Sequence, residues 1–169
     1  MATREIHTWP SEVLKEKAAP VEEFGEELQR LIDDMLETMY AAPGIGLAAP
    51  QVGVSQRLMV IDLSSGTESD QVLVLANPRI VETAGEATSD EGCLSLPELS
   101  LKVCRAESIV VRGHDRQGRE VEVRGEDLLA RALQHEIDHL DGVLLLDRVN
   151  PLRREIVKKK LKKALAASE

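Results

Sequence analysis

The segment H-E-I-D-H at residues 135–139 constrains the fold of this chain more than any other feature of its sequence. On an α-helix, side chains four residues apart leave the same face one turn apart, so in a helix His135 and His139 can share one metal ion. The carboxylate of Glu136 would then lie beside the imidazoles, where it can accept a proton from a metal-bound water. Helix formers precede the segment and Gly142 follows it, so we predict a helix that ends at this glycine.

A catalytic metal site of this kind needs a third protein ligand, and Cys93 is the candidate. It lies in the segment E-G-C-L-S at residues 91–95, where glycine and the nearby Pro97 indicate irregular structure. A thiolate and two imidazoles form a tetrahedral site with one position left for water. Two alternatives stay open at this point: a chance match of H-E-x-x-H on a solvated helix, and a buried apolar role for Cys93 such as we expect for Cys104.

Length and composition indicate a single domain over residues 1–169. The chain is 43% hydrophobic, which excludes an intrinsically disordered protein, and it is long enough to bury a core without disulfide bonds. Two cysteines and the lack of an apolar stretch near the N-terminus argue against a secreted, disulfide-rich domain. Because no apolar run reaches the roughly 18–20 residues of a membrane span, we expect a cytoplasmic protein without membrane contact. We also expect it to be a monomer.

The order of the predicted elements favours an α+β fold with mixed or antiparallel sheets packed around the H-E-x-x-H helix. Helical periodicity is found before the first strand and after the last one, rather than between strands. We predict further helices at residues 11–18, 21–40 and 151–167, and strands at residues 58–63, 72–76, 79–83, 108–113 and 119–123. The last two strands flank D-R-Q-G, which is typical of a hairpin turn.

A glycine-rich segment follows the second helix. Residues 44–53 hold three glycines, a proline and mostly small or apolar side chains, a composition that suits a loop whose backbone runs close to another part of the molecule. The segment lacks the G-K-[ST] ending of a phosphate-binding loop. Gln51 is its one polar side chain, and a plain connector between helix and strand is the alternative interpretation.

Three segments together resemble the peptide deformylase family. They are G-I-G-L-A-A-P-Q at residues 44–51, E-G-C-L-S at residues 91–95 and Q-H-E-I-D-H-L at residues 134–140, which match the family motifs in residue type, order and approximate spacing. The resemblance covers nearly the whole chain, from Pro10 to the basic C-terminal segment. It implies an enzyme that removes the formyl group from the N-terminal methionine of newly synthesised polypeptides.

The resemblance also implies the chemistry of the motifs. The ligands of a divalent metal, typically Fe(II) but replaceable by Zn, Ni or Co in purified protein, would be Cys93, His135 and His139. A metal-bound hydroxide would attack the formyl carbon, with Glu136 as the general base and then as the acid that protonates the departing amine. Hydrogen-bond donors stabilise the oxyanion of the intermediate. In this chain they correspond to the Gln51 side chain and the backbone N–H of Leu94.

A slot for the methionine side chain is a further implication. The predicted substrate-binding residues are Gly44, Ile45, Gly46, Leu128 and Ala132. The last two precede His135 by seven and three residues, so they share roughly its helix face, and ordinary core packing is the alternative. Arg131 stands where some relatives have an apolar residue, which predicts a more polar outer part of the slot.

Two supporting contacts are also predicted around the metal ligands. A metal-bound histidine usually donates its second N–H to a carboxylate or a carbonyl, and Glu91 is the nearest candidate in the motifs. Arg105 and Asp138 are predicted to pair and to brace the helix.

The net charge of −9 is unevenly distributed along the chain. Residues 148–163 hold eight basic residues against one acid, so this segment carries +7 and the remainder carries −16. A basic tail on an acidic body favours a polyanionic partner, and the resemblance implies that this partner is the ribosome near the exit of the nascent chain. The alternative is a solvated helix with cations near its C-terminus.

Two other functions compete with deformylation. A zinc peptidase uses the same H-E-x-x-H motif but would need a third His or Glu downstream, which leaves the segment around Cys93 without a role. A closed structural metal site needs four protein ligands. A catalytically inactive ribosome-binding module would be expected to lack Glu136 or Gln51, and both are present.

Overall fold

A computed structural model describes residues 2–68 and 71–168 of the chain. Its strands lie in sequence between helices α1 (Glu26–Ala41) and α2 (Asp127–Leu140), and helix α3 (Pro151–Ser168) follows at the C-terminal end. The strands are β1 (Gly46–Ala48), β2 (Leu58–Asp62), β3 (Val72–Ala84), β4 (Ala87–Cys93), β5 (Leu96–Arg105), β6 (Ser108–His114) and β7 (Glu120–Glu126). Short 3-10 helices are η1 (Glu12–Lys15), η2 (Ala49–Val52) and η4 (Leu145–Arg148).

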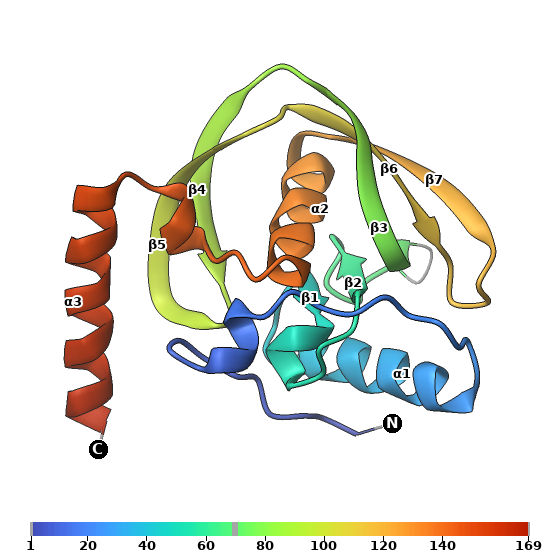
Figure 1. The fold of residues 1–169 in the computed structure, drawn as a ribbon, viewed down its shortest axis with the longest axis horizontal. Coiled ribbons are helices and arrows are strands. Elements are labelled where there is room, and N and C mark those ends of the chain that lie inside the picture. Colours follow the sequence, from blue (N-terminus) through green and yellow to red (C-terminus); the bar gives the residue numbers. More distant parts are fainter. Residues whose placement is uncertain (1, 69–70, 169) are drawn as a thin grey trace.

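Two antiparallel sheets surround α2. The larger sheet has the strand order β1-β2-β3-β6-β7, and the smaller one is the β4–β5 hairpin. The chain passes from one sheet to the other at residues 85–86 and again at residues 106–107, so the strands arch over the helix (Figure 1). The predicted α+β class, with sheets around the H-E-x-x-H helix, is therefore confirmed.

The buried apolar residues form three clusters. The first joins α2 to the large sheet, and the second joins α1 to β1 and β2. The third joins the β4–β5 hairpin to the N-terminal segment, η4 and α3 through residues such as Trp9, Leu101 and Leu161. Because the chain has one Trp, one Tyr and one Phe, aliphatic side chains fill most of this core.

Several predicted elements differ from the observed ones. The helix predicted to start at residue 21 begins at Glu26, because Asn77 holds Val21 by two hydrogen bonds of 2.7 and 3.0 Å in a non-helical segment. The same Asn77, with φ 51°, lies at a register shift in the pairing of β3 with β6. The strand continues through this irregularity, so the two strands predicted on either side of Asn77 are the single strand β3. The helix predicted at residues 11–18 is only the 3-10 turn η1.

Some elements were missed, whereas one turn and one helix end were predicted correctly. The β4–β5 hairpin was not predicted, and the glycine-rich loop contains the short elements β1 and η2. The predicted turn between β6 and β7 is confirmed by a 3.0 Å hydrogen bond from Gly118 N to Asp115 O. Gly142, with φ 75°, follows α2 as expected of a glycine after a helix end. None of the helices in the described ranges has the length and apolar character needed to cross a membrane.

Candidate metal centre and active site

Three side chains from two elements form a group that can hold a metal ion. Cys93 ends β4, whereas His135 and His139 lie one turn apart on α2. Their donor atoms lie within 4.8 Å of one another, and His139 Nε2 is 3.3 Å from Cys93 Sγ. A metal–nitrogen bond of about 2.0–2.1 Å and a metal–sulfur bond of about 2.3 Å can span the 3.3 Å between these two atoms. A soft thiolate with two imidazoles suits a divalent transition metal, and three protein donors leave one position for water.

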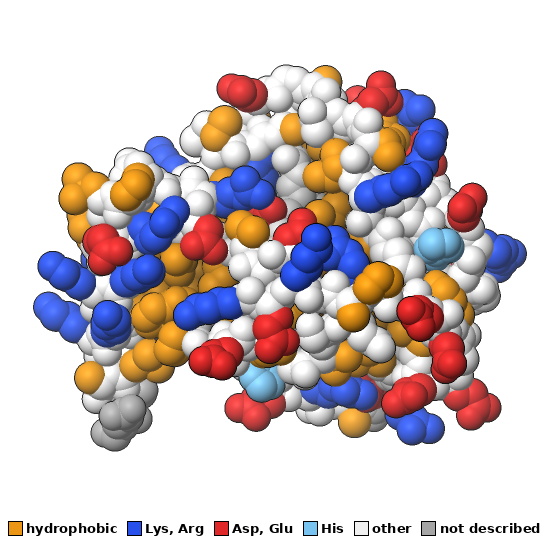
Figure 2. All heavy atoms as spheres, viewed as in Figure 1, with side chains coloured by type: hydrophobic (Ala, Val, Ile, Leu, Met, Phe, Trp, Pro, Cys, Tyr) orange, Lys and Arg blue, Asp and Glu red, His pale blue; other side chains and the backbone are white. Residues whose placement is uncertain are grey.

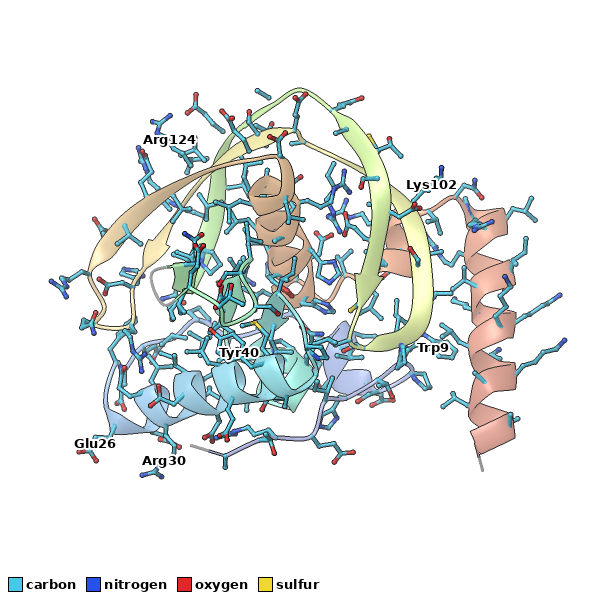
Figure 3. The ribbon with its side chains drawn as sticks, turned by 180° about the vertical axis from the view of Figure 1, so that it is seen from behind. Trp9, Glu26, Arg30, Tyr40, Lys102 and Arg124 are labelled. Carbon is cyan, nitrogen blue, oxygen red and sulfur yellow. The ribbon has the colours of Figure 1, made fainter. Side chains whose placement is uncertain are left out.

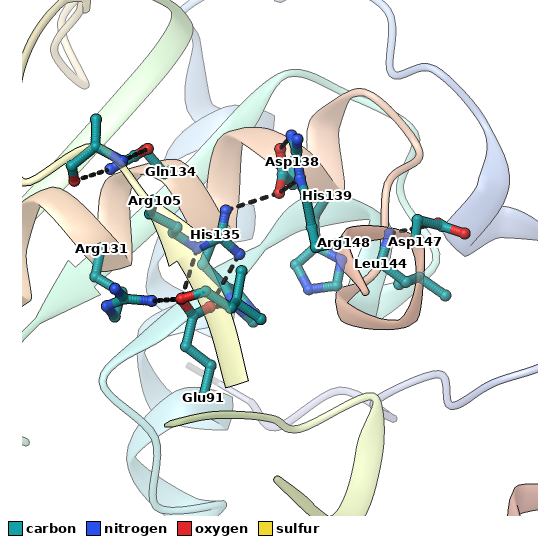
Figure 4. A network of polar contacts seen from close by, with 12 residues as sticks. Glu91, Arg105, Arg131, Gln134, His135, Asp138, His139, Leu144, Asp147 and Arg148 are labelled. Carbon is teal, nitrogen blue, oxygen red and sulfur yellow. Dashed lines mark hydrogen bonds and ion pairs between the residues drawn. The ribbon is translucent and has the colours of Figure 1, made fainter. Parts of the chain in front are cut away.

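Glu91 supports the first of these imidazoles. Its carboxylate is buried, and Oε1 accepts a 3.0 Å hydrogen bond from His135 Nδ1, which leaves Nε2 for a metal (Figure 4). Burial opposes ionisation of Glu91, but hydrogen bonds from His135 and Arg105 lower its pKa to about 2. Arg105 also binds Asp138 at 2.9 Å, so both predicted supporting contacts are confirmed as contacts.

Glu136 is buried next to the three donors. Its side chain is only 2% exposed in total, and Oε1 has no hydrogen-bond partner among the described residues. The backbone of Gly46 lies against it so closely that a Cβ at this position would be 3.0 Å from Glu136 Oε2. The glycine-rich segment does run close to another part of the molecule, as its composition predicts, and that part is Glu136.

The electrostatic environment distinguishes the ionisable groups of the site. Burial raises the pKa of Glu136 to about 7, against the opposing effect of the positive charges on His135 and Arg105. Burial and the nearby charges of His135 and Arg105 lower the pKa of His139 well below its ordinary value. Glu136, unlike Glu91, therefore has an environment that favours the neutral carboxyl at neutral pH and below.

Gln51 is fixed with its amide N–H groups toward the cysteine. Its Oε1 accepts a 3.0 Å hydrogen bond from the backbone N–H of Ala48, which determines the orientation of the amide. Its Nε2 then donates to Ser95 Oγ at 3.1 Å and lies 3.8 Å from Cys93 Sγ. Ser95, which the sequence did not indicate, donates in turn to the carbonyl of His7 at 2.7 Å.

These residues line one pocket of about 820 Å³. Ten of the eleven predicted site residues line it: Gly44, Ile45, Gly46, Gln51, Cys93, Leu94, Leu128, Ala132, His135 and Glu136. The exception is His139, which is 1% exposed and contacts Cys93 from behind the pocket wall. Leu128 is 52% exposed at the rim, whereas Ala132 is buried, so the two predicted walls lie at different depths.

Arg131 and Arg148 have roles that the sequence did not reveal. Arg131 lines the pocket, but its guanidinium binds Glu91 and backbone carbonyls, so its charge is compensated within the wall. Arg148, counted above with the basic tail, binds Asp138 Oδ2 at 2.9 Å and belongs to the polar network of the site.

An α+β fold whose pocket joins a Cys–His–His group to a buried carboxylate defines a metal-dependent hydrolase. The family model described as "Polypeptide deformylase" matches residues 3–155. The chain therefore belongs to the polypeptide deformylase family, whose members are metal-dependent enzymes that remove the N-formyl group.

Individual relatives agree with this assignment over nearly their full lengths. The peptide deformylase of Thermodesulfovibrio yellowstonii is 54% identical over 162 residues, which cover 96% of this chain and 98% of that protein. The peptide deformylase of Syntrophobacter fumaroxidans is 55% identical over 165 residues, which cover 98% of this chain and 97% of that protein. The crystal structure of a peptide deformylase from Legionella pneumophila matches with a TM-score of 0.92 at 48% identity, covering 99% of this chain and 98% of that one.

Proposed function

We propose that Cys93, His135 and His139 bind the catalytic metal of this deformylase and that Glu136 is its general base and acid. The observation that carries the proposal is the buried Glu136 carboxylate, which has an oxygen without a hydrogen-bond partner among the described residues and lines the same pocket as Cys93 and His135. A divalent cation, which we propose to be Fe(II) with Zn, Ni or Co as substitutes, supplies positive charge that polarises a carbonyl and lowers the pKa of water.

Glu136 carries the proton between the two halves of the reaction. As a carboxylate it accepts a proton from the attacking water, and as a carboxylic acid it returns a proton to the departing amine. The close backbone of Gly46 keeps its carboxyl group against the donor group and leaves it little room to turn away. Glu136 is almost completely buried between β1 and α2. Bulk water therefore does not reach its carboxyl group from the side away from the pocket.

Gln51 and Leu94 supply hydrogen-bond donors for the oxyanion. The Gln51 amide is already oriented by Ala48. One N–H of its Nε2 donates to Ser95, and the other, on the side of Cys93, is the proposed donor to the reacting carbonyl. The backbone N–H of Leu94 follows Cys93 directly and lines the same pocket. Loss of one such donor typically lowers the rate about 100–1,000-fold.

The rest of the pocket accommodates the substrate, which we propose to be an N-formyl-methionyl nascent peptide. Gly44, Ile45 and Gly46 present backbone groups to the peptide main chain, and Leu128 and Ala132 form apolar walls for the methionine side chain. A pocket of about 820 Å³ lies within the range of roughly 300–1,000 Å³ that is common for small-ligand sites.

Formate release from a formyl-Met tripeptide tests these assignments. The protein is purified anaerobically, reconstituted with Fe(II) or Ni(II), and measured beside Glu136→Ala. Metal-dependent release that the substitution abolishes, without cleavage of the unformylated peptide, is the expected result. Cleavage of the unformylated peptide would favour the zinc peptidase, and release by a fully active Glu136→Ala would refute the role of Glu136.

The basic helix α3 is proposed to bind the ribosome. Lys and Arg side chains gather along α3 at the edge of the molecule (Figure 2), and Arg153, Lys159, Lys160, Lys162 and Lys163 are exposed. Arg148 pairs with Asp138, so its charge is already compensated within the molecule. We further propose that the protein acts as a cytoplasmic monomer with residues 1–169 as a single domain, which is supported by a family match that runs from residue 3 to residue 155.

A further inference from the structure

The proposed metal ligands belong to two separately packed parts of the molecule. The apolar residues of α2 pack with the large sheet in the first cluster. Cys93 packs with the β4–β5 hairpin in the third cluster, together with residues such as Leu101 and Val103. Because these clusters share no buried residue, apolar packing does not by itself fix the distance between the cysteine and the two histidines.

Polar side chains connect the two parts. Arg105, at the end of β5, binds Asp138 on α2, and His135 on α2 binds Glu91 on β4. Each of these contacts joins one side chain to another. Side chains on both sides of these contacts can rotate. Gln134 on α2 does bind the backbone N–H and carbonyl of Ala106, at 3.1 and 2.9 Å, but Ala106 lies just beyond the end of β5.

Arg131 joins α2 to the backbone of the hairpin itself. Its Nη1 donates to the carbonyl of Val103 on β5 at 3.0 Å, and its Nη2 donates to the carbonyl of Ala87 on β4 at 2.7 Å. Nη1 also contacts Glu91 Oε2, and Arg105 approaches the same carboxylate from a different side (Figure 4). The Arg131 side chain is only 12% exposed, and of its contacts the one with the Ala87 carbonyl lies at the surface.

We propose that Arg131 is a positioning residue that holds the β4–β5 hairpin against α2 and thereby sets the distance between Cys93 and the two histidines. It precedes His135 by one helical turn, so it acts on the same face of α2. The planar guanidinium of Arg131 can donate hydrogen bonds to three acceptors at once. The ammonium group of a lysine donates from a single nitrogen and cannot reproduce this geometry. This inference rests on the ligand set proposed above and adds a residue that touches neither the metal donors nor the reacting atoms.

The first test compares Arg131→Met with Arg30→Met in the cobalt-loaded protein. Met keeps an unbranched apolar stem at position 131 but removes every hydrogen bond. Arg30 points away from the body of the molecule on α1 (Figure 3). We expect Arg131→Met to lose cobalt to a chelator about 10–100-fold more readily, in the range usual for residues that support metal ligands. The absorption bands of thiolate-bound cobalt should shift as well. Arg30→Met should behave as the wild type.

Kinetics give a second, independent readout. In the Ni(II) enzyme we expect Arg131→Met to lower kcat with little change in KM, because the methionine still offers an apolar wall to the substrate. Arg131→Lys should fall between Arg131→Met and the wild type in cobalt retention. A wild-type cobalt spectrum and wild-type cobalt retention in Arg131→Met would overturn the proposal. If Arg131→Met does not fold, a wild-type cobalt spectrum and wild-type cobalt retention in Arg131→Lys would overturn the proposal.

Cys93→Ala separates this inference from the proposed function. If Cys93→Ala keeps its cobalt and its spectrum, the proposed ligand set is wrong, whatever Arg131 does. If Cys93→Ala loses the thiolate bands while Arg131→Met does not differ from the wild type, the ligand set stands and only the role of Arg131 fails.

Discussion

At Gly46 the backbone of β1 lies against the carboxylate of Glu136. An added Cβ would approach Oε2 at 3.0 Å and the carboxyl carbon at 3.2 Å, so Gly46→Ala must displace the Glu136 side chain by a few tenths of an ångström or more. We expect kcat for formate release to fall about 10–100-fold, since small misplacements of a catalytic group have large effects. Metal content should be unchanged, because Glu136 is not among the proposed ligands.

Gly25→Ala is the matched control for Gly46→Ala. Gly25 has no atom within 4 Å of an added Cβ, and its φ of −90° is accessible to alanine. Wild-type activity is expected for this variant. If Gly46→Ala were as active as Gly25→Ala, the close approach would have no consequence for Glu136.

Tyr40 provides a residue-level test of the second apolar cluster. It is the one tyrosine of the chain, and it donates a 2.6 Å hydrogen bond to the buried Asp62 from the end of α1 (Figure 3). Burial and the adjacent Asp62 carboxylate raise the pKa of Tyr40 to about 12. Because the folded state favours the protonated phenol, this contribution to stability is present below about pH 10 and is lost as the pH rises toward 12.

Ultraviolet absorbance of the tyrosinate measures this pKa directly. We expect a midpoint near 12 in the folded protein, a lower midpoint in Asp62→Asn, and the ordinary value of about 10 in urea. A folded wild-type protein that titrates near 10 would contradict the buried hydrogen bond.

At the scale of elements, local patterns could be predicted and long-range ones could not. The H-E-x-x-H helix and the β6–β7 hairpin follow from spacing within a few residues, and both are observed. The β4–β5 hairpin escaped prediction because most residues of β4 are polar and exposed, so its sequence shows no apolar alternation. The interactions of Arg131 with Ala87 and Val103 depend on that hairpin, so its position in the wall could not be predicted either.

The buried charges between the hairpin and α2 make a prediction about stability. Arg105 is 4% exposed and pairs with Glu91 and Asp138, so Arg105→Met leaves two buried carboxylates with fewer partners. Breaking a buried ion pair from one side costs about 3–5 kcal/mol, and we expect the lower end because Arg131 and Arg148 remain. Urea unfolding of the metal-free protein measures the free energy without a contribution from metal binding.

Arg112→Met serves as the control for Arg105→Met. Arg112 is 57% exposed and pairs with Glu122 at 3.2 Å on the surface of the large sheet. Exposed pairs of this kind contribute at most about 1 kcal/mol. Equal losses of unfolding free energy in the two variants would show that burial does not distinguish the two pairs.

At the scale of the whole molecule, α3 is both packed and charged. Val157 and Leu161 are buried in the third cluster with Trp9 and the hairpin, so deleting the helix would uncover the part of the core that carries Cys93. The exposed lysines, in contrast, extend from the other faces of the helix. Charge substitutions therefore test the proposed ribosome contact more cleanly than a truncation does.

We expect the triple variant Lys159→Gln, Lys160→Gln and Lys163→Gln to bind ribosomes more weakly than the wild type. Each lost phosphate contact should reduce the slope of log affinity against log salt by about 0.7–0.9, so three contacts should reduce it by about 2–3. Formate release from a small formyl peptide should be unchanged, because the catalytic pocket is lined by none of these lysines.

A control with the same change in net charge replaces exposed basic residues elsewhere by Gln: Lys102, Arg119 and Arg124. Equal weakening in both variants would mean that total charge, and not α3, determines the association, whereas full affinity in the lysine variant would exclude α3 as the contact.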